Sequence, residues 1–261
     1  MAILYEHTLS PYAQKVEISA REKIIDLELR TPDGIGAGGA QGEFVDANPR
    51  AEAPAQIDGD VRIFDSTIIL EYLEDRTPSP AMLPATPAAR AKVRMIEEVC
   101  DTHYEAINWG LGEIAYFKRA SGAKAKEMQD RASRQTAKLQ SWLTKQLGSA
   151  DWFNDRAFGW GDLSVVPYVN ASVGFGNGPE EGSILGKWLA RANERPSVAR
   201  TAQEAIDSIA GMQQVANVLE QGLFKREYRD HRLEWMMKTG GPEIVLDGLK
   251  KNNIRYSYEF E

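Results

Sequence analysis

The chain has 261 residues, a formal net charge of −7 and 26% charged residues. A chain of this length can bury a sizeable core and is typical of one large or two modest domains. The acidic balance, without a long basic run, argues against nucleic acid or an anionic membrane surface as a partner.

Residues 1–76 alternate between extended and helical patterns. They predict a strand at 2–6, a helix at 11–25, a strand at 26–30, an extended segment before a turn at 58–60, a strand at 61–64 and a helix from Ser66. A loop or short helix follows the second predicted strand. This order predicts a mixed sheet with helices on its faces.

The pattern changes after residue 76. Residues 77–87 (TPSPAMLPATP) are rich in proline, as expected of an extended linker. Beyond them the hydrophobic period is helical, and it predicts helices at 88–119, 124–147, 162–171 and 184–193. We therefore expect the α/β plus all-α fold class, with an N-terminal domain at 1–77, a linker at 78–87 and an all-helical domain at 88–222.

The last stretch, 223–261, forms an extension. KREYRDHRLEWMMK, at 225–238, predicts a basic amphipathic helix, and Gly240-Gly241-Pro242 predicts a break before a second helix. IRYSYEF, at 254–260, alternates as a strand would. We expect this extension to be ordered and either to cap a ligand site or to join the edge of a sheet.

The cysteine and histidine content limits the kinds of catalytic or metal site that the chain can form. Cys100 is the single cysteine and lies in a helical pattern, where a small buried apolar role is expected rather than a nucleophilic one. His7 and His231 have no partners at metal-ligand spacing and His103 stands alone on a predicted helix, so we expect no metal. Without a signal-type segment or an apolar run of about 18 residues, a cytoplasmic protein is expected.

The glycine-rich run Gly34-Ile35-Gly36-Ala37-Gly38-Gly39 matches the G-x-G-x-x-G pattern of dinucleotide sites. Such a site needs a full helix that opens at the third glycine. Only QGEFVDA separates the run from Asn48-Pro49, which is too short to present a helix dipole to a pyrophosphate. We therefore disfavour a dinucleotide site.

The pair Ser10-Pro11 allows two interpretations. Serine is a common N-cap and proline is common at the first helical position, so the pair predicts an ordinary helix start. The same helix start, with free N–H groups and a positive dipole end, would also stabilise an anion such as a thiolate. The rest of the chain has to decide between them.

Further motifs settle this choice through a family resemblance. They are Asn48-Pro49-Arg50-Ala51-Glu52-Ala53-Pro54, Asp65-Ser66, Phe158-Gly159-Trp160-Gly161-Asp162, Trp188 and Glu194-Arg195-Pro196-Ser197-Val198. Over residues 1–215 the chain resembles the glutathione S-transferase superfamily, in its serine-type form, closest to tau, omega-like and bacterial β-etherase-like members. The resemblance implies a thioredoxin-like domain followed by a helical bundle, glutathione as co-substrate and a homodimer.

The resemblance also assigns a glutathione site. It implies that Ser10 donates a hydrogen bond to the thiolate, that Pro54 is cis and that Ala53 pairs its backbone with the tripeptide. Asp65 and Ser66 would hold the γ-glutamyl end, and Gln41 is a weaker transfer because the loop lengths differ. A serine at position 10 cannot form a mixed disulfide, which favours thiolate attack over disulfide exchange.

The sequence departs from the family pattern at four of these positions. Ala51 replaces the usual Gly, Ala53 the usual Val, Asp65 the usual Glu and Gly159 the usual capping Ser or Thr. Asp reaches one methylene less far than Glu. Glycine at an N-cap costs only a few tenths of a kcal/mol, so we expect the helix after Gly159 to form.

An acceptor site is expected between the two domains. Tyr104, Asn108 and Leu111 share one face of a predicted helix, and Tyr12 and Tyr168 are further candidates. The competing interpretation is that these residues belong to the core or to a dimer contact.

Three functions follow from these expectations. The first is a glutathione transferase that acts in detoxification or aromatic compound catabolism. It would attack a hydrophobic electrophile, expected to be aromatic, by conjugation or aryl-ether cleavage. The second is a noncatalytic protein of the same fold that binds hydrophobic ligands. The third, a glutathione-dependent isomerase or reductase, is disfavoured because its cysteine-bearing or serine-rich signatures are absent.

Overall fold

The N-terminal part is a four-stranded sheet with helices on both faces. The computed structural model describes residues 1–35, 39–209, 215–223, 225–228, 230–256 and 260. The N-terminal elements are β1 (Ala2–Tyr5), α1 (Pro11–Glu22), β2 (Leu27–Arg30), α2 (Glu43–Ala47), β3 (Ala55–Asp58), β4 (Val61–Phe64) and α3 (Ser66–Arg76). This order confirms the one predicted from the sequence.

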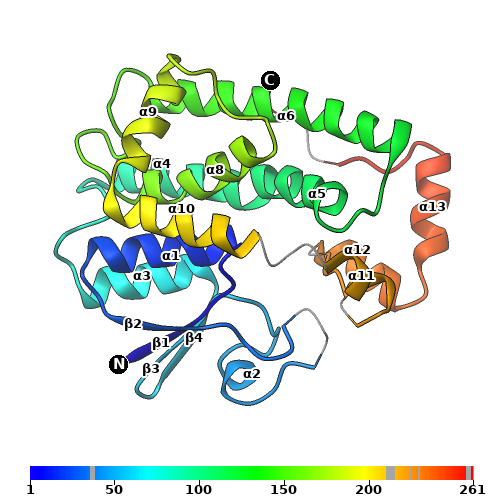
Figure 1. Ribbon diagram of the computed structural model, residues 1–261, viewed down its shortest axis with the longest axis horizontal. Coiled ribbons are helices and arrows are strands. Elements are labelled where there is room, and N and C mark those ends of the chain that lie inside the picture. The colour runs from blue at the N-terminus through cyan, green and yellow to red at the C-terminus, as the bar shows by residue number, and fades with distance from the viewer. Residues whose placement is uncertain (36–38, 210–214, 224, 229, 257–259, 261) are drawn as a thin grey trace.

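The strands lie in the order β2-β1-β3-β4, with β1 and β2 parallel and the other pairs antiparallel. Helices α1 and α3 cover one face and α2 covers the other (Figure 1). Successive side chains of β1 serve both faces, because side chains alternate along a strand. Leu4 joins the core under α1 and α3, whereas Tyr5 joins a smaller cluster with Phe44 of α2.

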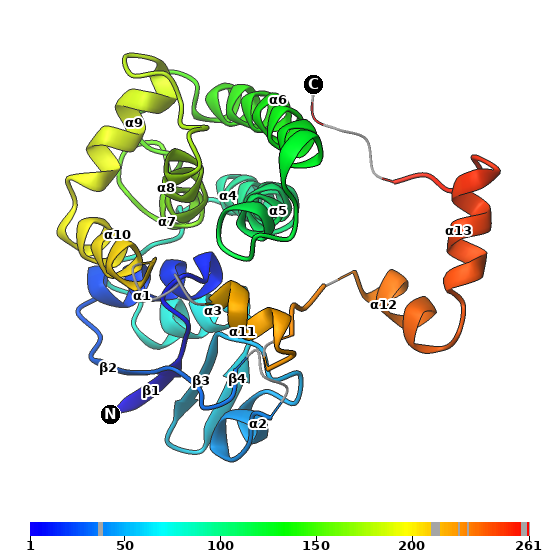
Figure 2. The same cartoon turned by 45° about the vertical axis from the view of Figure 1, so that its right-hand side comes forward.

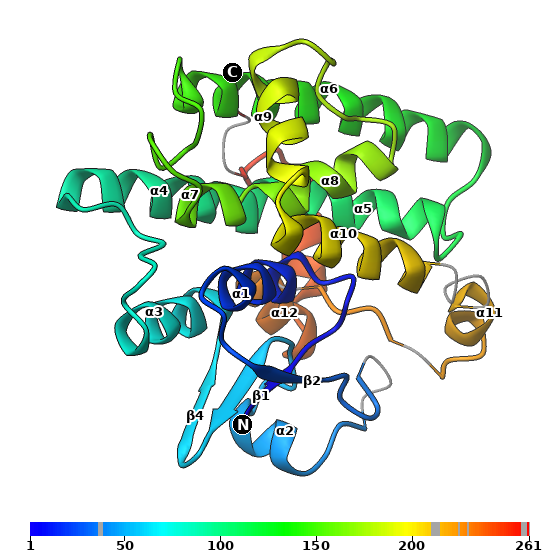
Figure 3. The same cartoon turned by 60° about the vertical axis from the view of Figure 1, so that its left-hand side comes forward.

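The second part of the chain is helical. Its elements are α4 (Pro87–Val99), a π-helical turn at Cys100–Tyr104, α5 (Glu105–Ala115), α6 (Gly122–Leu147), α7 (Trp160–Leu163), α8 (Val166–Gly174), α9 (Ile184–Asn193) and α10 (Pro196–Ile209). The proline-rich segment predicted as a linker connects α3, in the sheet half, to α4, in the helical half (Figure 3). The α/β plus all-α fold class is thereby confirmed.

Two helix predictions need correction. The segment predicted as one helix at 88–119 contains the π-helical turn and ends at Ala115. The helix predicted at 162–171 is two helices, because α7 ends at Leu163 and α8 begins at Val166 with a proline in its first turn. The helix expected after Gly159 does form.

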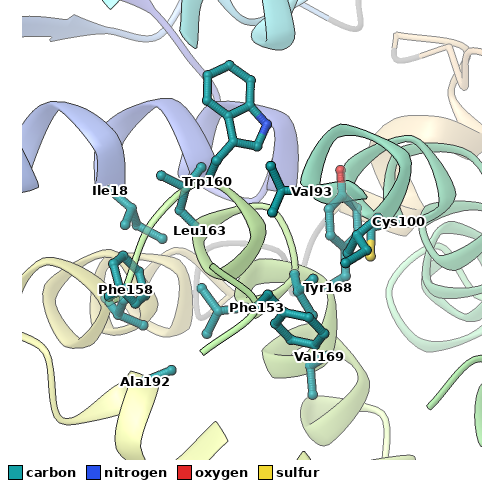
Figure 4. Packing of buried hydrophobic residues seen from close by; sticks show 14 of the residues in the cluster. Ile18, Val93, Cys100, Phe153, Phe158, Trp160, Leu163, Tyr168, Val169 and Ala192 are labelled. Atoms are coloured by element: carbon teal, nitrogen blue, oxygen red, sulfur yellow. The ribbon is translucent and has the colours of Figure 1, made fainter. Parts of the chain in front are cut away.

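One hydrophobic core joins the two halves. Ile18 of α1, Val93 of α4, Trp160 of α7 and Tyr168 of α8 all belong to it (Figure 4). Helix α10 also packs along α1. Helix α1 packs against α3 of the sheet half and against α7, α8 and α10 of the helical half. These contacts on both sides fix the position of its N-terminus.

The C-terminal extension differs from its prediction. It contains α11 (Val215–Glu220), α12 (His231–Lys238) and α13 (Pro242–Lys250), and the last two stand away from the helical body (Figure 2). The helix predicted at 225–238 begins only at His231, where Asp230 caps it. Residues 254–256 form no strand, and 257–259 of the predicted strand lie outside the described residues.

Candidate functional site

The sheet topology brings the predicted glutathione-binding residues to one edge. Strands β1 and β3 are antiparallel, with Tyr5 opposite Ala55, so the end of β1 lies beside the start of β3. Strands β3 and β4 are antiparallel too, with Ala55 opposite Phe64. The loop that leads to Ser10, the loop that ends at Pro54 and the turn at Asp65 therefore open on the same edge.

Ser10 caps α1 and keeps a hydroxyl proton to donate. Its oxygen accepts a hydrogen bond from the Ala13 N–H at 3.4 Å, and its side chain is partly exposed. A serine hydroxyl has one donor and two acceptor lone pairs, so capping uses a lone pair and leaves the proton available. No acceptor for this proton occurs among the described residues. The capping and thiolate-binding interpretations are therefore compatible.

The loop before β3 is held by Asn48. Its side chain is 1% exposed, donates to the Glu52 carbonyl at 2.6 Å and accepts from the Arg50 N–H at 3.0 Å. Ala51 has a φ of 54°, a left-handed conformation that an alanine adopts at a cost and glycine adopts freely. This explains why glycine is usual at position 51.

The Ala53–Pro54 peptide bond is cis, as the resemblance implies. Ala53 lies outside β3, and no hydrogen bond to its backbone N–H or C=O occurs within the described part of the chain. Both groups therefore remain to pair with an extended peptide, in the manner of an added strand.

Asp65 and Ser66 form the N-terminus of α3. The Asp65 Oδ1 atom accepts from the Thr67 and Ile68 N–H groups, at 3.0 and 3.4 Å, and leaves Oδ2 uncommitted within the described residues. Asp65 has a φ of 76°, a strained conformation for a non-glycine residue. Ser66 follows at the first helical position and is 4% exposed. The pair thus places a carboxylate and a helix start together.

An open hollow of about 620 Å³ adjoins Asp65. Arg50, Arg62 and Phe64 contribute to its lining, and the Arg50 guanidinium carbon lies 4.8 Å from the centre of the Phe64 ring. The two arginines were not singled out from the sequence. Arg62 is an exposed residue of β4, where a lone cation ordinarily has only a solvation role, so no local signal marks it.

The loop after β2 contains the remaining predicted contact. Gln41 is exposed and precedes Gly42, the residue before α2. Of the glycine-rich run, residues 36–38 lie outside the described residues. Helix α2 has only five residues, in agreement with the argument against a dinucleotide site.

The predicted acceptor residues are mostly buried. Tyr104 and Tyr168 are 0% exposed and Leu111 is 6% exposed. Asn108 donates to the Tyr168 carbonyl at 2.9 Å and accepts from the Ser172 hydroxyl at 3.0 Å. In this conformation these side chains belong to the interior of the bundle, as the competing interpretation expects.

Tyr12 differs from the other predicted acceptor residues because it is partly exposed. Its hydroxyl donates to the Asp101 carbonyl at 2.6 Å. Its ring meets the Tyr168 ring edge-on, with centroids 6.3 Å apart. Of the five predicted acceptor residues, Tyr12 is therefore the one that keeps exposed surface in this conformation.

A buried ionic cluster behind α1 was missed from the sequence. Lys15 is fully buried, and its ammonium lies 2.6 Å from Glu97 and 2.5 Å from Asp101. The two carboxylates raise the pKa of Lys15 against the opposing effect of burial. Glu97 also accepts from the Thr67 hydroxyl at 2.9 Å. The cluster thus ties α1 and the first turn of α3 to α4 and to the π-helical turn that follows it.

Cys100 is 0% exposed and belongs to the core, which confirms its predicted buried role. Burial raises the pKa of its thiol well above the ordinary value. Among the described residues, no group of three His, Cys, Asp or Glu side chains is arranged to hold a metal ion. The helices in that part of the chain include none long and apolar enough to cross a bilayer.

Comparison with known proteins gives the class. The family model described as glutathione S-transferase, N-terminal domain, matches residues 4–81. A glutathione S-transferase from Rhodospirillum rubrum F11 superposes with a TM-score of 0.67 at 25% identity, over 77% of this chain and 91% of that one. Residues 4–81 thus match a glutathione S-transferase N-terminal domain, and the fold is that of glutathione S-transferases.

The curated relatives span several activities. Glutathione S-transferase U28 of Arabidopsis thaliana is 25% identical over 210 residues, which are 78% of this chain and 89% of that protein. Maleylacetoacetate isomerase of Mus musculus is 41% identical over 100 residues, which are 37% of this chain and 46% of the isomerase. The chain thus matches less than half the length of that relative.

Proposed function

We propose that this protein is a glutathione transferase in which Ser10 activates the thiol of glutathione. The observation that carries the proposal is the Ser10 hydroxyl at the start of α1, with its oxygen engaged by Ala13 and its proton uncommitted within the described residues. A free thiol has a pKa of about 8.5, so little of it is thiolate at neutral pH. A hydrogen bond and a helix N-terminus both favour the thiolate.

The other contacts would hold the tripeptide across the sheet edge. The Ala53 backbone would pair with its middle, as an added strand does. The Ser66 N–H and hydroxyl would bind the γ-glutamyl carboxylate at the N-terminus of α3, and the uncommitted Asp65 oxygen would attract the α-ammonium. Gln41 lies in the loop after β2 and is a weaker candidate for the same role.

The reaction needs no redox partner. The thiolate sulfur attacks an electrophilic carbon and forms a carbon–sulfur bond, the leaving group departs with its electron pair, and the thiol proton passes to solvent. Conjugation and aryl-ether cleavage both follow this scheme. We propose a hydrophobic aromatic acceptor, bound beside Tyr12, in detoxification or aromatic compound catabolism.

Retention on immobilised glutathione tests the proposal. The full chain should be retained and should be released by free glutathione, and a screen of aryl halides and β-aryl ethers should then identify the acceptor class. Failure to bind glutathione would overturn the transferase proposal. It would favour a noncatalytic protein of the same fold that carries hydrophobic ligands.

An isomerase function remains the third candidate. The 41% identity to maleylacetoacetate isomerase over 100 residues supports glutathione chemistry without selecting the isomerisation. Turnover of maleylacetoacetate in the presence of glutathione, without turnover of aryl halides or ethers, would favour it.

We further propose that the protein is cytoplasmic and that two copies associate, as the resemblance implies. Ile68 on α3 is 53% exposed and Met95 on α4 is 47% exposed, which leaves large apolar side chains available for a partner. Light scattering coupled to size-exclusion chromatography should give twice the chain mass of 29.0 kDa. A monomeric mass would contradict the dimer.

A further inference from the structure

Residues 225–228, in the C-terminal extension, dock on the end of α5 through a buried carboxylate. Glu113 is 8% exposed and is the centre of this contact. It accepts from Arg119 at 2.8 Å, from the Arg226 Nε and from the Tyr228 hydroxyl at 3.3 Å. This docking explains why the helix predicted to begin at 225 begins later.

Aromatic rings fix the Arg226 side chain in place. Its guanidinium carbon lies 4.5 Å from the centre of the Trp109 ring and 4.0 Å from that of Phe117. The Tyr228 ring meets Trp109 edge-on, with centroids 4.5 Å apart. A guanidinium held between rings and 15% exposed is a pre-organised, partly desolvated cation.

The docked segment closes one side of a hollow of about 490 Å³. Phe117, Leu219 and Tyr228 supply apolar surface to its lining. The cations in the lining are Lys118, Arg119, Lys225 and Arg226, and Glu220 is the acidic residue among them. Even with Glu113 counted against the arginines, positive charge is in excess here, in a chain whose net charge is −7.

We propose that this hollow binds an aromatic carboxylate. Glu113 engages one nitrogen of each arginine, and each guanidinium has five N–H donors, so both can also bind a second carboxylate. The ring of the ligand would lie against Phe117 and Leu219. A volume of this size accommodates a small aromatic acid. The lining residues of the hollow lie outside residues 4–81, and none of them belongs to the proposed glutathione site.

Titration calorimetry of the full chain with cinnamate tests the site. Cinnamate should bind, and its uncharged amide should bind about tenfold or more weakly, because the amide cannot form the charge-assisted pair. Arg119→Gln should weaken cinnamate binding by about tenfold or more. Arg156 lies outside the lining of the hollow, and its side chain is 96% exposed. Arg156→Gln removes the same charge as Arg119→Gln and should change the affinity for cinnamate by less than about twofold.

A second measurement separates loss of the site from loss of folding. Cinnamate should protect residues 225–228 from limited proteolysis in the parent chain and in Arg156→Gln, but not in Arg119→Gln. All three chains should unfold at similar temperatures. Equal binding of cinnamate and its amide, binding unaffected by Arg119→Gln, or no binding at all would overturn the proposal. Ser10→Ala should leave cinnamate binding unchanged, so the two proposals fail separately.

Discussion

The Lys15 ammonium of α1 lies 2.5 Å from the Asp101 carboxylate, and this ion pair spans the boundary between the sheet half and the helical half. Lys15 is completely buried, and Glu97 on α4 shares it. Because the same helix begins with Ser10, the ionic cluster helps to fix the orientation of the helix start that is proposed to face the thiol.

Removal of the Lys15 charge should therefore destabilise the fold. Lys15→Met leaves two carboxylates buried without their cation, and we expect a loss of about 3–5 kcal/mol in the free energy of unfolding. Urea denaturation measures it. Lys124→Met, at a side chain that is 68% exposed, is the matched control and should cost little. Equal losses in the two variants would show that the buried pair has no special role.

Glu17 should make stability depend on pH. Burial and the nearby Glu6 carboxylate, opposed in part by Arg21, together raise the pKa of its carboxyl to about 8. Between about pH 4.5 and pH 8 the folded chain holds a proton that the unfolded chain has released. The free energy of unfolding should therefore fall as the pH rises through this window, by up to about 1.4 kcal/mol per pH unit.

The variant Glu17→Gln removes this titration. Relative to the parent, it should gain roughly 2–4 kcal/mol more at about pH 9 than at about pH 5. Denaturant melts at both pH values measure the difference. Glu127→Gln, whose parent side chain is 70% exposed, should show no such difference. A relative stability of Glu17→Gln that is constant with pH would rule out the buried titration.

Gly159 should tolerate no side chain. A Cβ atom at this position would lie 2.0 Å from the Asn154 Nδ2 and 2.4 Å from the Met82 carbonyl oxygen. Gly159→Ala should cost about 2–4 kcal/mol, because both neighbours must move. Gly110→Ala, in α5 with nothing within 4 Å of its Cβ, should be neutral or stabilising. The steric clash would explain why glycine stands at position 159 in place of the family's usual Ser or Thr. Thermal melts in which Gly110→Ala is the more destabilised variant would refute that explanation.

The local parts of the site were predictable from the sequence. A helix start at Ser10-Pro11, a cis Pro54 and a helix start at Asp65-Ser66 each depend on a few adjacent residues and a family motif. The order of strands and helices along residues 1–76 followed from the alternation of extended and helical patterns. These features are set within short stretches of chain, so short-range signals are enough to predict them.

The long-range parts were not predictable. Lysine is almost never fully buried, so nothing local marks Lys15 as the centre of an ionic cluster. Tyr104, Asn108 and Leu111 have a helical spacing that fits a cleft as well as a core, and in the structure all three are buried. The docking of Arg226 on Glu113 joins residues that are 113 positions apart, a contact that no periodicity reports.

The central claim is that the Ser10 hydroxyl lowers the pKa of the bound glutathione thiol. The direct measurement is a pH titration of the thiolate absorbance with glutathione bound to the parent chain, to Ser10→Ala and to Thr86→Ala. Thr86 caps α4 as Ser10 caps α1, accepting from Ala89 at 3.3 Å, so its variant controls for the loss of a cap. We predict that Ser10→Ala raises the thiol pKa by about one unit or more and cuts turnover by about tenfold or more, with glutathione still bound. An unchanged thiol pKa and turnover in Ser10→Ala would contradict the account.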